Sequence, residues 1–279
     1  MTTGTCVIAI DAGTTGVRAR SVHLDGRAPE SEYQEFTQFF PEPGLVEHDV
    51  DEIWSAVVST LNAVVQRVGR DNVAAIGITN QRETVVAWSR STGEPHGRAI
   101  VWQDRRTADE CAQLERNGLL PMVRERTGLV LDPYFSGTKY ARMLRDRSIA
   151  VDGDLALGTI DSWIIWKLTN GEAHVTDPTN ASRTMLYNIV EHRWDDALCD
   201  ALKVPIGALP EVRPSSGRFG LTSGGSGIPD GIPISGVAGD QQAALFGQAC
   251  FDQGMAKNTY GTGSFVLLNV GTESPPVTD

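Results

Sequence analysis

The sequence predicts a layered α/β domain in which helices cover a sheet, and three observations lead to this prediction. Residues 6 to 25 read as two strands joined by a Gly/Thr turn. From Asp51 onward, apolar residues recur at helical spacing as far as Val68. Strand-like and helix-like segments then alternate along the chain to Ala249. This mixture is typical of domains in which helices pack on the faces of a sheet.

Composition narrows the class of protein. The chain has 279 residues, of which 41% are hydrophobic and 21% charged, as in soluble globular proteins. A net charge of −11 argues against a nucleic-acid surface, and no Lys/Arg run suggests an anionic membrane patch. The first residues show neither a signal peptide nor a membrane span, so no membrane insertion is expected. Four scattered cysteines lack metal-ligand or redox spacing and favour the cytoplasm: Cys6, Cys111, Cys199 and Cys250.

The first elements are the clearest. Cys6 to Ile10 predicts a buried strand, which runs through Asp11-Ala12-Gly13-Thr14-Thr15-Gly16 into a second strand from Val17 to Leu24. The turn between them frees backbone N–H groups. A helix follows, closed by Gly69, with its apolar stripe at Ile53, Trp54, Val57, Val58, Leu61, Val64, Val65 and Val68.

The middle of the chain predicts repeated strands and helices. Strands are expected at Val73–Thr79, Thr84–Trp88, Ala99–Trp102, Leu157–Ile160 and Ile234–Val237. Helices are expected at Thr107–Asn117, Thr138–Arg145, Asp161–Leu168, Asp195–Leu202 and Asp240–Ala249. The Gly/Ser/Pro-rich stretch from Pro214 to Pro233 is interpreted as surface loops with room for a short strand.

The last part of the chain predicts a domain boundary near Gln253-Gly254. Met255 to Tyr260 and Ser264 to Val270 form a second hairpin around Gly261-Thr262-Gly263. Because a lone hairpin is marginal in water, we expect it to join another sheet. The predicted organisation is a substrate-binding domain over residues 1–253, with residues 254–279 as the first hairpin of a second domain that is missing here. We expect the tail 255–279 to be mobile or paired with a neighbouring chain.

The two Gly/Thr turns predict phosphate binding. The Lys-containing phosphate loop and the dinucleotide glycine fingerprint are both absent from the sequence. At Gly13-Thr14-Thr15 and Gly261-Thr262-Gly263, glycine lets the backbone approach a ligand, and N–H and hydroxyl donors suit phosphate oxygens. Either turn alone is more often plain structure. The two together, each near an aspartate, indicate one nucleotide held from both sides.

Those aspartates each have two interpretations. Asp11, at a strand end, either caps the turn or holds a hydrated Mg²⁺. Asp240 begins a helix, where an aspartate commonly serves as the N-cap. An ionised carboxylate there also suits phosphoryl transfer, because the loose transition state needs alignment of the attacking hydroxyl more than strong proton abstraction.

Asn80-Gln81-Arg82-Glu83-Thr84 places five polar residues between two apolar strands. Taken alone, the segment is typical of a solvated loop. As a site, it offers a guanidinium and a carboxylate that could bind the vicinal hydroxyls of a small polyol. Trp102 and Tyr134 are candidates for flat walls against the carbon chain, although either aromatic alone is more often core.

Seven segments together resemble the N-terminal part of the glycerol kinases, a family of sugar kinases. They are Ile10–Thr15, Asn80–Thr84, Trp102–Thr107, Asp132–Ser136, Thr176–Arg183, Gly236–Gln242 and Asn258–Gly263. The resemblance spans essentially the whole chain and implies a ribonuclease H-like, actin-like ATPase fold with a central mixed sheet flanked by helices. The Asn-Gln-Arg-Glu element separates the chain from xylulose and other pentose kinases, which usually differ there.

The resemblance implies ATP-dependent phosphorylation of glycerol to sn-glycerol 3-phosphate. It makes Asp240 the catalytic base and implies hydrogen bonds to glycerol from Arg82, Glu83, Tyr134 and Asp240, with Gln241 close by and Trp102 packing on the carbon chain. It implies contacts to the ATP phosphates from Thr14, Thr15, Arg18, Thr262 and Gly263. Asp11, with Asp240, would hold Mg²⁺, in the case of Asp11 through water.

Several alternatives stay open at this point. The chain could belong to a kinase of another polyol or a pentulose, or be a non-catalytic polyol-binding half-protein. An actin-like filament subunit or chaperone ATPase would share the hairpins but has no use for Arg82-Glu83. Gly231 stands where some bacterial relatives carry an arginine for fructose 1,6-bisphosphate, which argues against that regulation. With its adenine-binding half missing, the chain is expected to be nearly inactive alone. The resemblance is compatible with a homodimer or a homotetramer.

Overall fold

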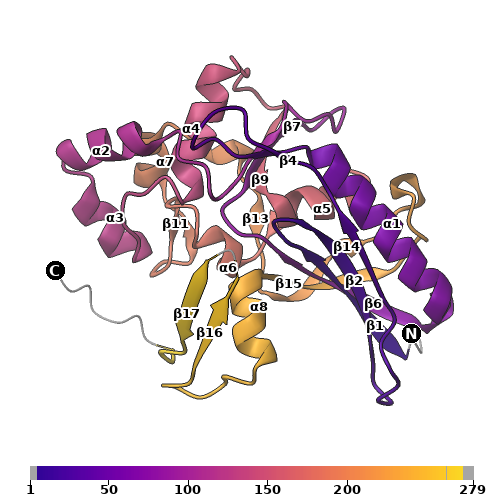
Figure 1. Ribbon diagram of the computed structural model, residues 1–279. Coiled ribbons are helices and arrows are strands. Elements are labelled where there is room, and N and C mark those ends of the chain that lie inside the picture. The colour runs from indigo at the N-terminus through magenta and orange to yellow at the C-terminus, as the bar shows by residue number, and fades with distance from the viewer. Residues whose placement is uncertain (1–4, 262, 273–279) are drawn as a thin grey trace.

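The computed structural model describes residues 5–261 and 263–272, and its centre is a six-stranded mixed sheet (Figure 1). The strand order is β14 (Ser216–Leu221), β15 (Pro233–Gly239), β6 (Val73–Asn80), β1 (Cys6–Ala12), β2 (Gly16–His23) and β3 (Ser31–Glu35). β15, β6 and β1 run parallel, and the remaining neighbours pair antiparallel. The predicted mixed sheet is therefore confirmed.

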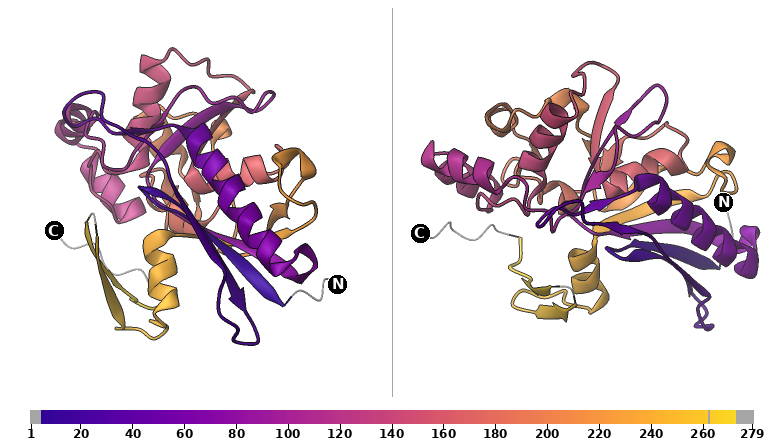
Figure 2. Two further views of the ribbon diagram at one scale, coloured as in Figure 1. Left: turned by 45° about the vertical axis from the view of Figure 1, so that its right-hand side comes forward. Right: turned by 45° about the horizontal axis from the view of Figure 1, so that its top comes forward.

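Helices α1 (Val50–Val68) and α5 (Ile160–Leu168) pack against one face of this sheet. The core between them contains inward-facing strand residues such as Ile8, Ile10 and Ile76. The helix α1 begins where the sequence predicted, because the Asp49 carboxylate accepts backbone hydrogen bonds from Asp51 and Glu52. Figure 2 shows α1 lying along the sheet.

A second, antiparallel sheet has the order β4 (Gln38–Phe39), β5 (Glu47–His48), β8 (Ala99–Ile100), β7 (Val85–Ser89) and β9 (Leu155–Thr159). A second core lies between it and helices that include α4 (Ser136–Asp146) and α7 (Asp196–Leu202). The remaining regular elements are α2 (Ala108–Arg116), α3 (Leu120–Thr127), α6 (Pro178–Ala181), β10 (Val175–Thr176), β11 (Tyr187–Asn188), β12 (Arg193–Trp194) and β13 (Glu211–Val212).

The chain then forms α8 (Asp240–Gly247) and a two-stranded antiparallel hairpin, β16 (Ala256–Tyr260) with β17 (Ser264–Leu268). Both strands of the hairpin contact α8, and the two elements lie side by side in Figures 1 and 2. Among the described residues the hairpin pairs with no other strand. Residues 273–279, part of the predicted mobile tail, lie outside the described residues.

Two of the details that differ from the sequence prediction are a shorter strand and an additional helix. The strand predicted at Ala99–Trp102 ends at Ile100. Helix α3 was not predicted, because its eight residues carry only a weak apolar stripe. The short strand for which the prediction left room between Pro214 and Pro233 is β14, an edge strand of the main sheet that is anchored by the buried Phe219. In the part of the chain that the structure describes, no helix is long and apolar enough to cross a membrane.

The two sheets are tied together at Gln81. Its side-chain amide donates to the Gly13 carbonyl at 3.0 Å and lies 3.3 Å from His48 Nδ1 on β5. With Nδ1 accepting from this amide, the other ring nitrogen of His48 donates to Gln38 Oε1 at 2.7 Å. Burial lowers the pKa of His48 to about 4, so the ring is neutral at physiological pH. The first Gly/Thr turn is thus fixed from the second sheet.

His48 makes the stability of the protein depend on pH. Because its pKa is about 4 in the folded chain and about 6.5 when exposed, the unfolded state binds more protons between these values. His48 therefore does not lower the free energy of unfolding above pH 6.5. As the pH falls toward 4, His48 lowers this free energy, by about 2 kcal/mol at pH 5. We expect His48→Asn to reduce the fall in melting temperature between pH 7.5 and pH 5.

The matched control is His192→Asn, an exposed residue whose φ of 54° asparagine tolerates. The control should leave the pH dependence of the melting temperature unchanged. If His48→Asn and the unchanged protein lose the same stability between the two pH values, the assignment of a neutral, buried His48 is wrong.

Candidate active site

The parallel strands β1, β6 and β15 end side by side. In the ladder, Asn80 at the end of β6 pairs with Ala12 of β1 on one side and Gly239 of β15 on the other. The segments that follow these ends therefore emerge together: the first Gly/Thr turn, the stretch from Gln81, and Asp240. Sites in α/β proteins commonly form at the carboxyl ends of parallel strands.

A pocket of about 130 Å³ lies beyond these ends, between the main sheet and the hairpin. Its walls include all six residues predicted to bind substrate, whereas three larger hollows on the described part of the chain contain no predicted site residue. The lining residues are Thr14, Arg82, Glu83, Trp102, Tyr134, Asp240, Gln241, Thr259, Gly261, Gly263 and Phe265.

Arg82 is the centre of the pocket's polar groups, with a side chain that is 6% exposed. Its guanidinium donates to Gln242 Oε1 at 3.1 Å and to the Tyr134 hydroxyl at 3.4 Å. Nε lies 3.2 Å from Asp240 Oδ1, so the two residues form an ion pair. However, the Nε–H makes no hydrogen bond with any described residue. A buried charged donor without an acceptor is costly unless a ligand or water completes it.

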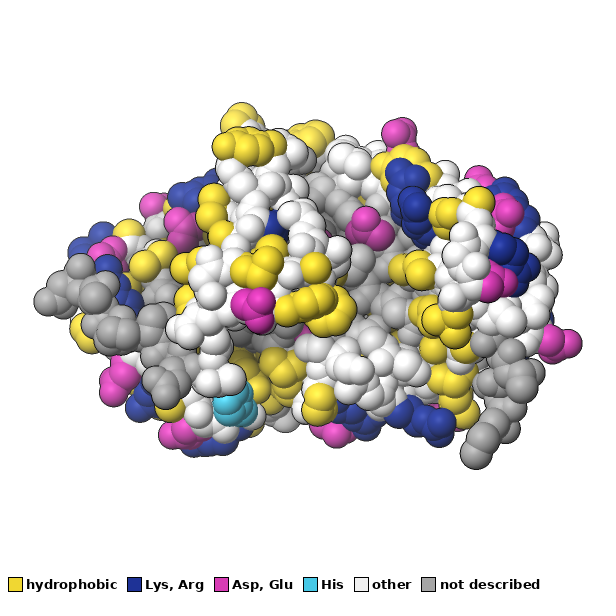
Figure 3. Space-filling view, turned by 90° about the horizontal axis from the view of Figure 1, so that it is seen from below, with side chains coloured by type: hydrophobic (Ala, Val, Ile, Leu, Met, Phe, Trp, Pro, Cys, Tyr) yellow, Lys and Arg dark blue, Asp and Glu magenta, His cyan; other side chains and the backbone are white. Residues whose placement is uncertain are grey.

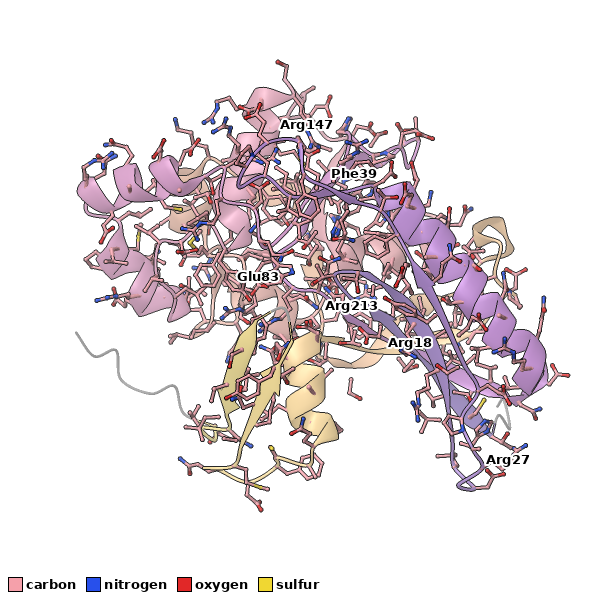
Figure 4. All side chains as sticks on the ribbon, in the orientation of Figure 1. Arg18, Arg27, Phe39, Glu83, Arg147 and Arg213 are labelled. Atoms are coloured by element: carbon pink, nitrogen blue, oxygen red, sulfur yellow. The ribbon has the colours of Figure 1, made fainter. Side chains whose placement is uncertain are left out.

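Glu83 is buried in a strained conformation. Its φ of 61° lies in the left-handed region, which costs about 1–3 kcal/mol for such a residue. Arg183 Nε binds the Glu83 carboxylate at 2.8 Å, and the Arg183 guanidinium lies 4.9 Å from the Phe135 ring centre. Ser136 Oγ donates to the Glu83 carbonyl at 3.2 Å. These contacts hold the carboxylate at the pocket near the centre of the molecule, where Figure 4 labels Glu83.

Aromatic rings form the apolar wall of the pocket. Trp102 and Tyr134 pack edge to face, with 5.8 Å between their ring centres. Trp102 packs in the same way against Phe265 of the hairpin, with 6.0 Å between the ring centres. The Trp102 indole N–H donates to Thr14 Oγ1 at 3.0 Å, which links this wall to the first turn. Burial raises the pKa of Tyr134 to about 12, so its hydroxyl remains protonated and able to donate.

A buried ammonium group positions the Tyr134 loop. Lys139 Nζ donates to the Pro133 carbonyl at 3.0 Å and to the Tyr134 carbonyl at 2.5 Å. Burial lowers the pKa of Lys139 to about 7, while the nearby Glu83 carboxylate opposes this shift.

A hydrogen-bond network around α6 supports the strand ends. Asn80 and Asn180 exchange side-chain hydrogen bonds at 3.0 and 3.2 Å, and Asp177 Oδ1 accepts from the Asn180 side chain at 2.9 Å. Thr179 Oγ1 accepts from the Gly239 backbone at 2.8 Å. In the polar stretch from Thr176 to Arg183, Asn180 thus holds β6, Thr179 holds β15, and Arg183 holds Glu83.

Two interpretations from sequence are wrong. All five residues from Asn80 to Thr84 are buried, so this segment is not a solvated loop. Asp240 is the first residue of α8 and not its N-cap, a place that Gly239 takes. Besides its ion pair with Arg82, the Asp240 carboxylate accepts the backbone N–H of the adjacent Gln241 at 2.7 Å, and it remains 37% exposed at the pocket.

Two of the residues expected to contact the ATP phosphates line this pocket. Thr14 and Gly263 line the pocket, whereas Thr15 and Arg18 lie outside it: Thr15 Oγ1 is 3.2 Å from the Tyr33 hydroxyl, and Arg18 lies over the Tyr33 ring. Figure 4 labels Arg18 away from Glu83, on β2 of the main sheet. Thr262 lies outside the described residues.

Asp11 and Asp240 were predicted to hold Mg²⁺. Desolvation by the surrounding chain and the negative charge of Asp240 raise the pKa of Asp11, while Arg18 opposes the shift. Because Asp11 itself is exposed, the charge of Asp240 is the cause that matters here. The two carboxylates are therefore close enough to repel each other, and a cation between them would relieve the repulsion. The described residues contain no group of three or more candidate ligands. A site with one or two carboxylates fits Mg²⁺, which keeps several waters and shares phosphate oxygens.

The sequence profile described as the FGGY family of carbohydrate kinases, N-terminal domain, matches residues 6–247. The chain belongs to this family. Curated relatives named glycerol kinase are similar to this FGGY chain, at 55% identity in Aeromonas salmonicida (strain A449) and 53% in Klebsiella pneumoniae (strain 342). These matches cover 96% and 98% of the chain but 54% and 56% of the relatives, so the chain spans about half their length.

Solved structures confirm the predicted fold class. A Plasmodium falciparum glycerol kinase with ADP is 34% identical, with a TM-score of 0.89 over 94% of this chain and 54% of its own. A xylulose kinase from Rhodospirillum rubrum has a TM-score of 0.86 at 22% identity, over 97% of this chain and 56% of its own, which shows a shared fold alone. The FGGY chain thus has the mixed-sheet, actin-like ATPase architecture.

Three residues with no role predicted from the sequence support the FGGY pocket: Phe265 lines it, and Gln242 and Arg183 contact residues that line it. Gln242 holds Arg82, Arg183 holds Glu83, and Phe265 closes the aromatic wall. The only signal for Arg183 was its place at the end of a polar stretch. Phe265 follows the second turn directly but is an ordinary strand residue in pattern.

Gly239 provides a test of this arrangement. Its backbone is at φ −57°, ψ 147°, which alanine adopts freely, but a Cβ there would stand 2.5 Å from Arg82 Cδ. We expect Gly239→Ala to displace Arg82 and to lower the free energy of unfolding by about 1–3 kcal/mol, as overpacking does. Denaturant unfolding measures the change.

The matched control is Gly247→Ala at the end of the same helix, where a Cβ would meet nothing within 4 Å. It should leave stability unchanged or raise it by up to about 1 kcal/mol. Equal stabilities for the two variants would contradict the close packing of Arg82 on Gly239.

Proposed function

We propose that this chain is the substrate-binding part of a kinase that transfers a phosphoryl group from ATP to glycerol and forms sn-glycerol 3-phosphate. The observation that carries the proposal is the Arg82 Nε–H, a buried cationic donor without an acceptor, placed between the carboxylates of Glu83 and Asp240. Vicinal hydroxyls need such alternating donors and acceptors. More than 50% identity with curated glycerol kinases supports the same reading.

Each pocket residue then has a role on glycerol. Arg82 donates to hydroxyl oxygens, and Glu83 accepts a hydroxyl proton. Tyr134 donates from its neutral hydroxyl, with Gln241 close by, and Trp102 packs against the carbon chain. Asp240 accepts the hydrogen bond of the attacking hydroxyl and aligns it, which is the main requirement of a loose phosphoryl-transfer transition state.

The nucleotide is proposed to bind between the two Gly/Thr turns. Thr14 and Gly263, which line the pocket, would meet the ATP phosphates, and Thr15, Arg18 and Thr262 remain proposed contacts at its edge. The Plasmodium relative bound to ADP supports nucleotide use. Asp11 and Asp240 would hold Mg²⁺, which neutralises phosphate charge when bound.

We further propose that residues 1–253 form one domain and that residues 254–279 open a second, nucleotide-binding domain. Figure 3 shows the molecule from below, and hydrophobic side chains are exposed on the face seen there. The exposed hydrophobic residues on the hairpin include Tyr260, Val266 and Leu268, whose exposed fractions are 82%, 69% and 54%.

We also propose a cytoplasmic location, since all four cysteines are free and buried. Assembly as a homodimer or a homotetramer is also part of the proposal.

The reaction is tested with the complete gene product in a coupled ADP-release assay with glycerol. We expect Asp240→Asn to lower kcat by about 10²-fold to 10⁴-fold, the range of a positioned base. Asp252→Asn, a change at an exposed residue in the following loop, is the control and should keep full activity. Full activity of Asp240→Asn would rule out its proposed role.

The 279-residue chain alone tests the need for further sequence. We expect little turnover, because in this proposal the chain supplies only part of the nucleotide site. Turnover by the chain alone at the level of the complete gene product would refute the proposed second domain.

Ligand specificity is tested by thermal stabilisation with a panel of polyols. We expect the largest rise in melting temperature with glycerol. A larger rise with a tetritol or a pentulose would favour another polyol kinase. Stabilisation by glycerol without any phosphorylation by the complete gene product would favour a non-catalytic polyol-binding protein.

A further inference from the structure

Lys257 is a buried cation in an otherwise exposed hairpin. It lies on β16, where its neighbours Ala256 and Asn258 are exposed, yet Lys257 itself is 3% exposed. Its side chain therefore points inward, from the hairpin toward α8. This residue has no role in the binding of glycerol or ATP proposed above.

The ammonium group joins two residues of the pocket wall. Lys257 Nζ donates to Gln241 Oε1 and, at 2.7 Å, to Thr259 Oγ1. Both partners line the pocket. Gln241 in turn donates its backbone N–H to Asp240 Oδ1 at 2.7 Å. Gln241 thus connects the two parts of the chain: its side chain accepts from Lys257 on the hairpin, and its backbone N–H binds the Asp240 carboxylate.

The cost of this arrangement argues for a specific role. Both acceptors are neutral, so the buried ammonium loses hydration without a direct ion pair. Burial lowers the pKa of Lys257, and Asp240 is the nearby negative charge that opposes the shift. An apolar side chain of similar length would pack the hairpin on α8 without this cost. Packing alone therefore does not account for a lysine here.

The position of the hairpin matters to the proposed reaction. Thr259 is two residues before Gly261, and Gly261 and Gly263 form the second Gly/Thr turn at the pocket wall. Asp240 is the first residue of α8, and the segment after α8 connects this helix to β16. Any rotation of the hairpin on α8 would change the distance between the proposed phosphate turn and the proposed base, and errors of about 1 Å are costly in such geometry.

We propose that Lys257 is a positioning residue that clamps the hairpin to the first turn of α8 and so fixes the phosphate turn relative to Asp240. This inference rests on the proposed kinase function for its catalytic consequence, whereas the clamp itself is a property of the folded chain. Loss of the clamp should affect the transfer step more than the binding of glycerol, because Lys257 touches none of Arg82, Glu83 and Tyr134 and, of the residues proposed at glycerol, contacts Gln241 alone among the described hydrogen bonds.

The kinetic test compares Lys257→Met and Gln241→Met, alone and together, in the complete gene product. We expect Lys257→Met to lower kcat by about tenfold to a hundredfold, the worth of one charge-assisted hydrogen bond, with the KM for glycerol changed less than about threefold. The double variant should be no slower than the slower single variant, because either substitution alone already removes the Lys257–Gln241 hydrogen bond. Lys167→Met, on α5 outside the pocket, should keep wild-type kinetics.

Hydrogen exchange provides a test that does not depend on activity. In Lys257→Met, the backbone amides of β16 and β17 should exchange about tenfold faster or more, while those of β1 and β6 stay unchanged. Exchange equal to wild type, kcat within twofold of wild type, or additive effects of the two substitutions would each overturn the proposal. If the unchanged protein fails to phosphorylate glycerol, the proposed function fails, and the exchange measurement still decides the clamp.

Discussion

The parallel pairing of β1, β6 and β15 is the constraint on which the rest of this structure depends. Because Asn80 pairs with Ala12 on one side and Gly239 on the other, three connecting segments must leave the sheet at one place. Arg82 and Asp240 then become neighbours although about 160 residues separate them in sequence. The same closeness requires glycine at position 239, since the Arg82 side chain occupies the space of a Cβ.

The polar groups gathered there are expensive to bury, and the fold offsets the cost locally. Glu83 has a left-handed backbone and a buried carboxylate, which Arg183 neutralises from a different segment. Asn80 is satisfied by Asn180, and Asp177 satisfies Asn180 in turn. Only the Arg82 Nε–H stays without an acceptor among these pocket groups. A site whose supporting polar groups are satisfied, but whose central donor is not, is prepared for a ligand oxygen.

The spacing of apolar residues was sufficient to predict the elements that bury a regular apolar stripe, such as α1 and the first hairpin. It was insufficient where tertiary contacts override local pattern. Five consecutive polar residues from Asn80 to Thr84 indicate exposure locally, but partners about 100 residues away make their burial possible. Arg183 and Lys257 were not assigned roles for the same reason, because their acceptors are defined only by the folded chain. The resemblance identified the residues of the pocket, but not the residues that hold them.

The pocket has walls from two parts of the chain, and this couples ligand binding to the placement of the hairpin. One wall comes from the ends of the parallel strands, and the other comes from Thr259, Gly261, Gly263 and Phe265. Besides its packing on α8, the described contacts of the hairpin include Trp102 with Phe265, Lys257 with Gln241, and Asn269 with the loop after α8. A ligand that touches both walls must therefore stabilise the docked hairpin by its own binding free energy, and a docked hairpin must raise ligand affinity by the same factor. Elements with few buried contacts are the ones that proteins use for closure around a substrate. The hairpin thus supplies one wall of the pocket, and in our proposal Lys257 is the polar contact that determines how firmly this wall is held on α8.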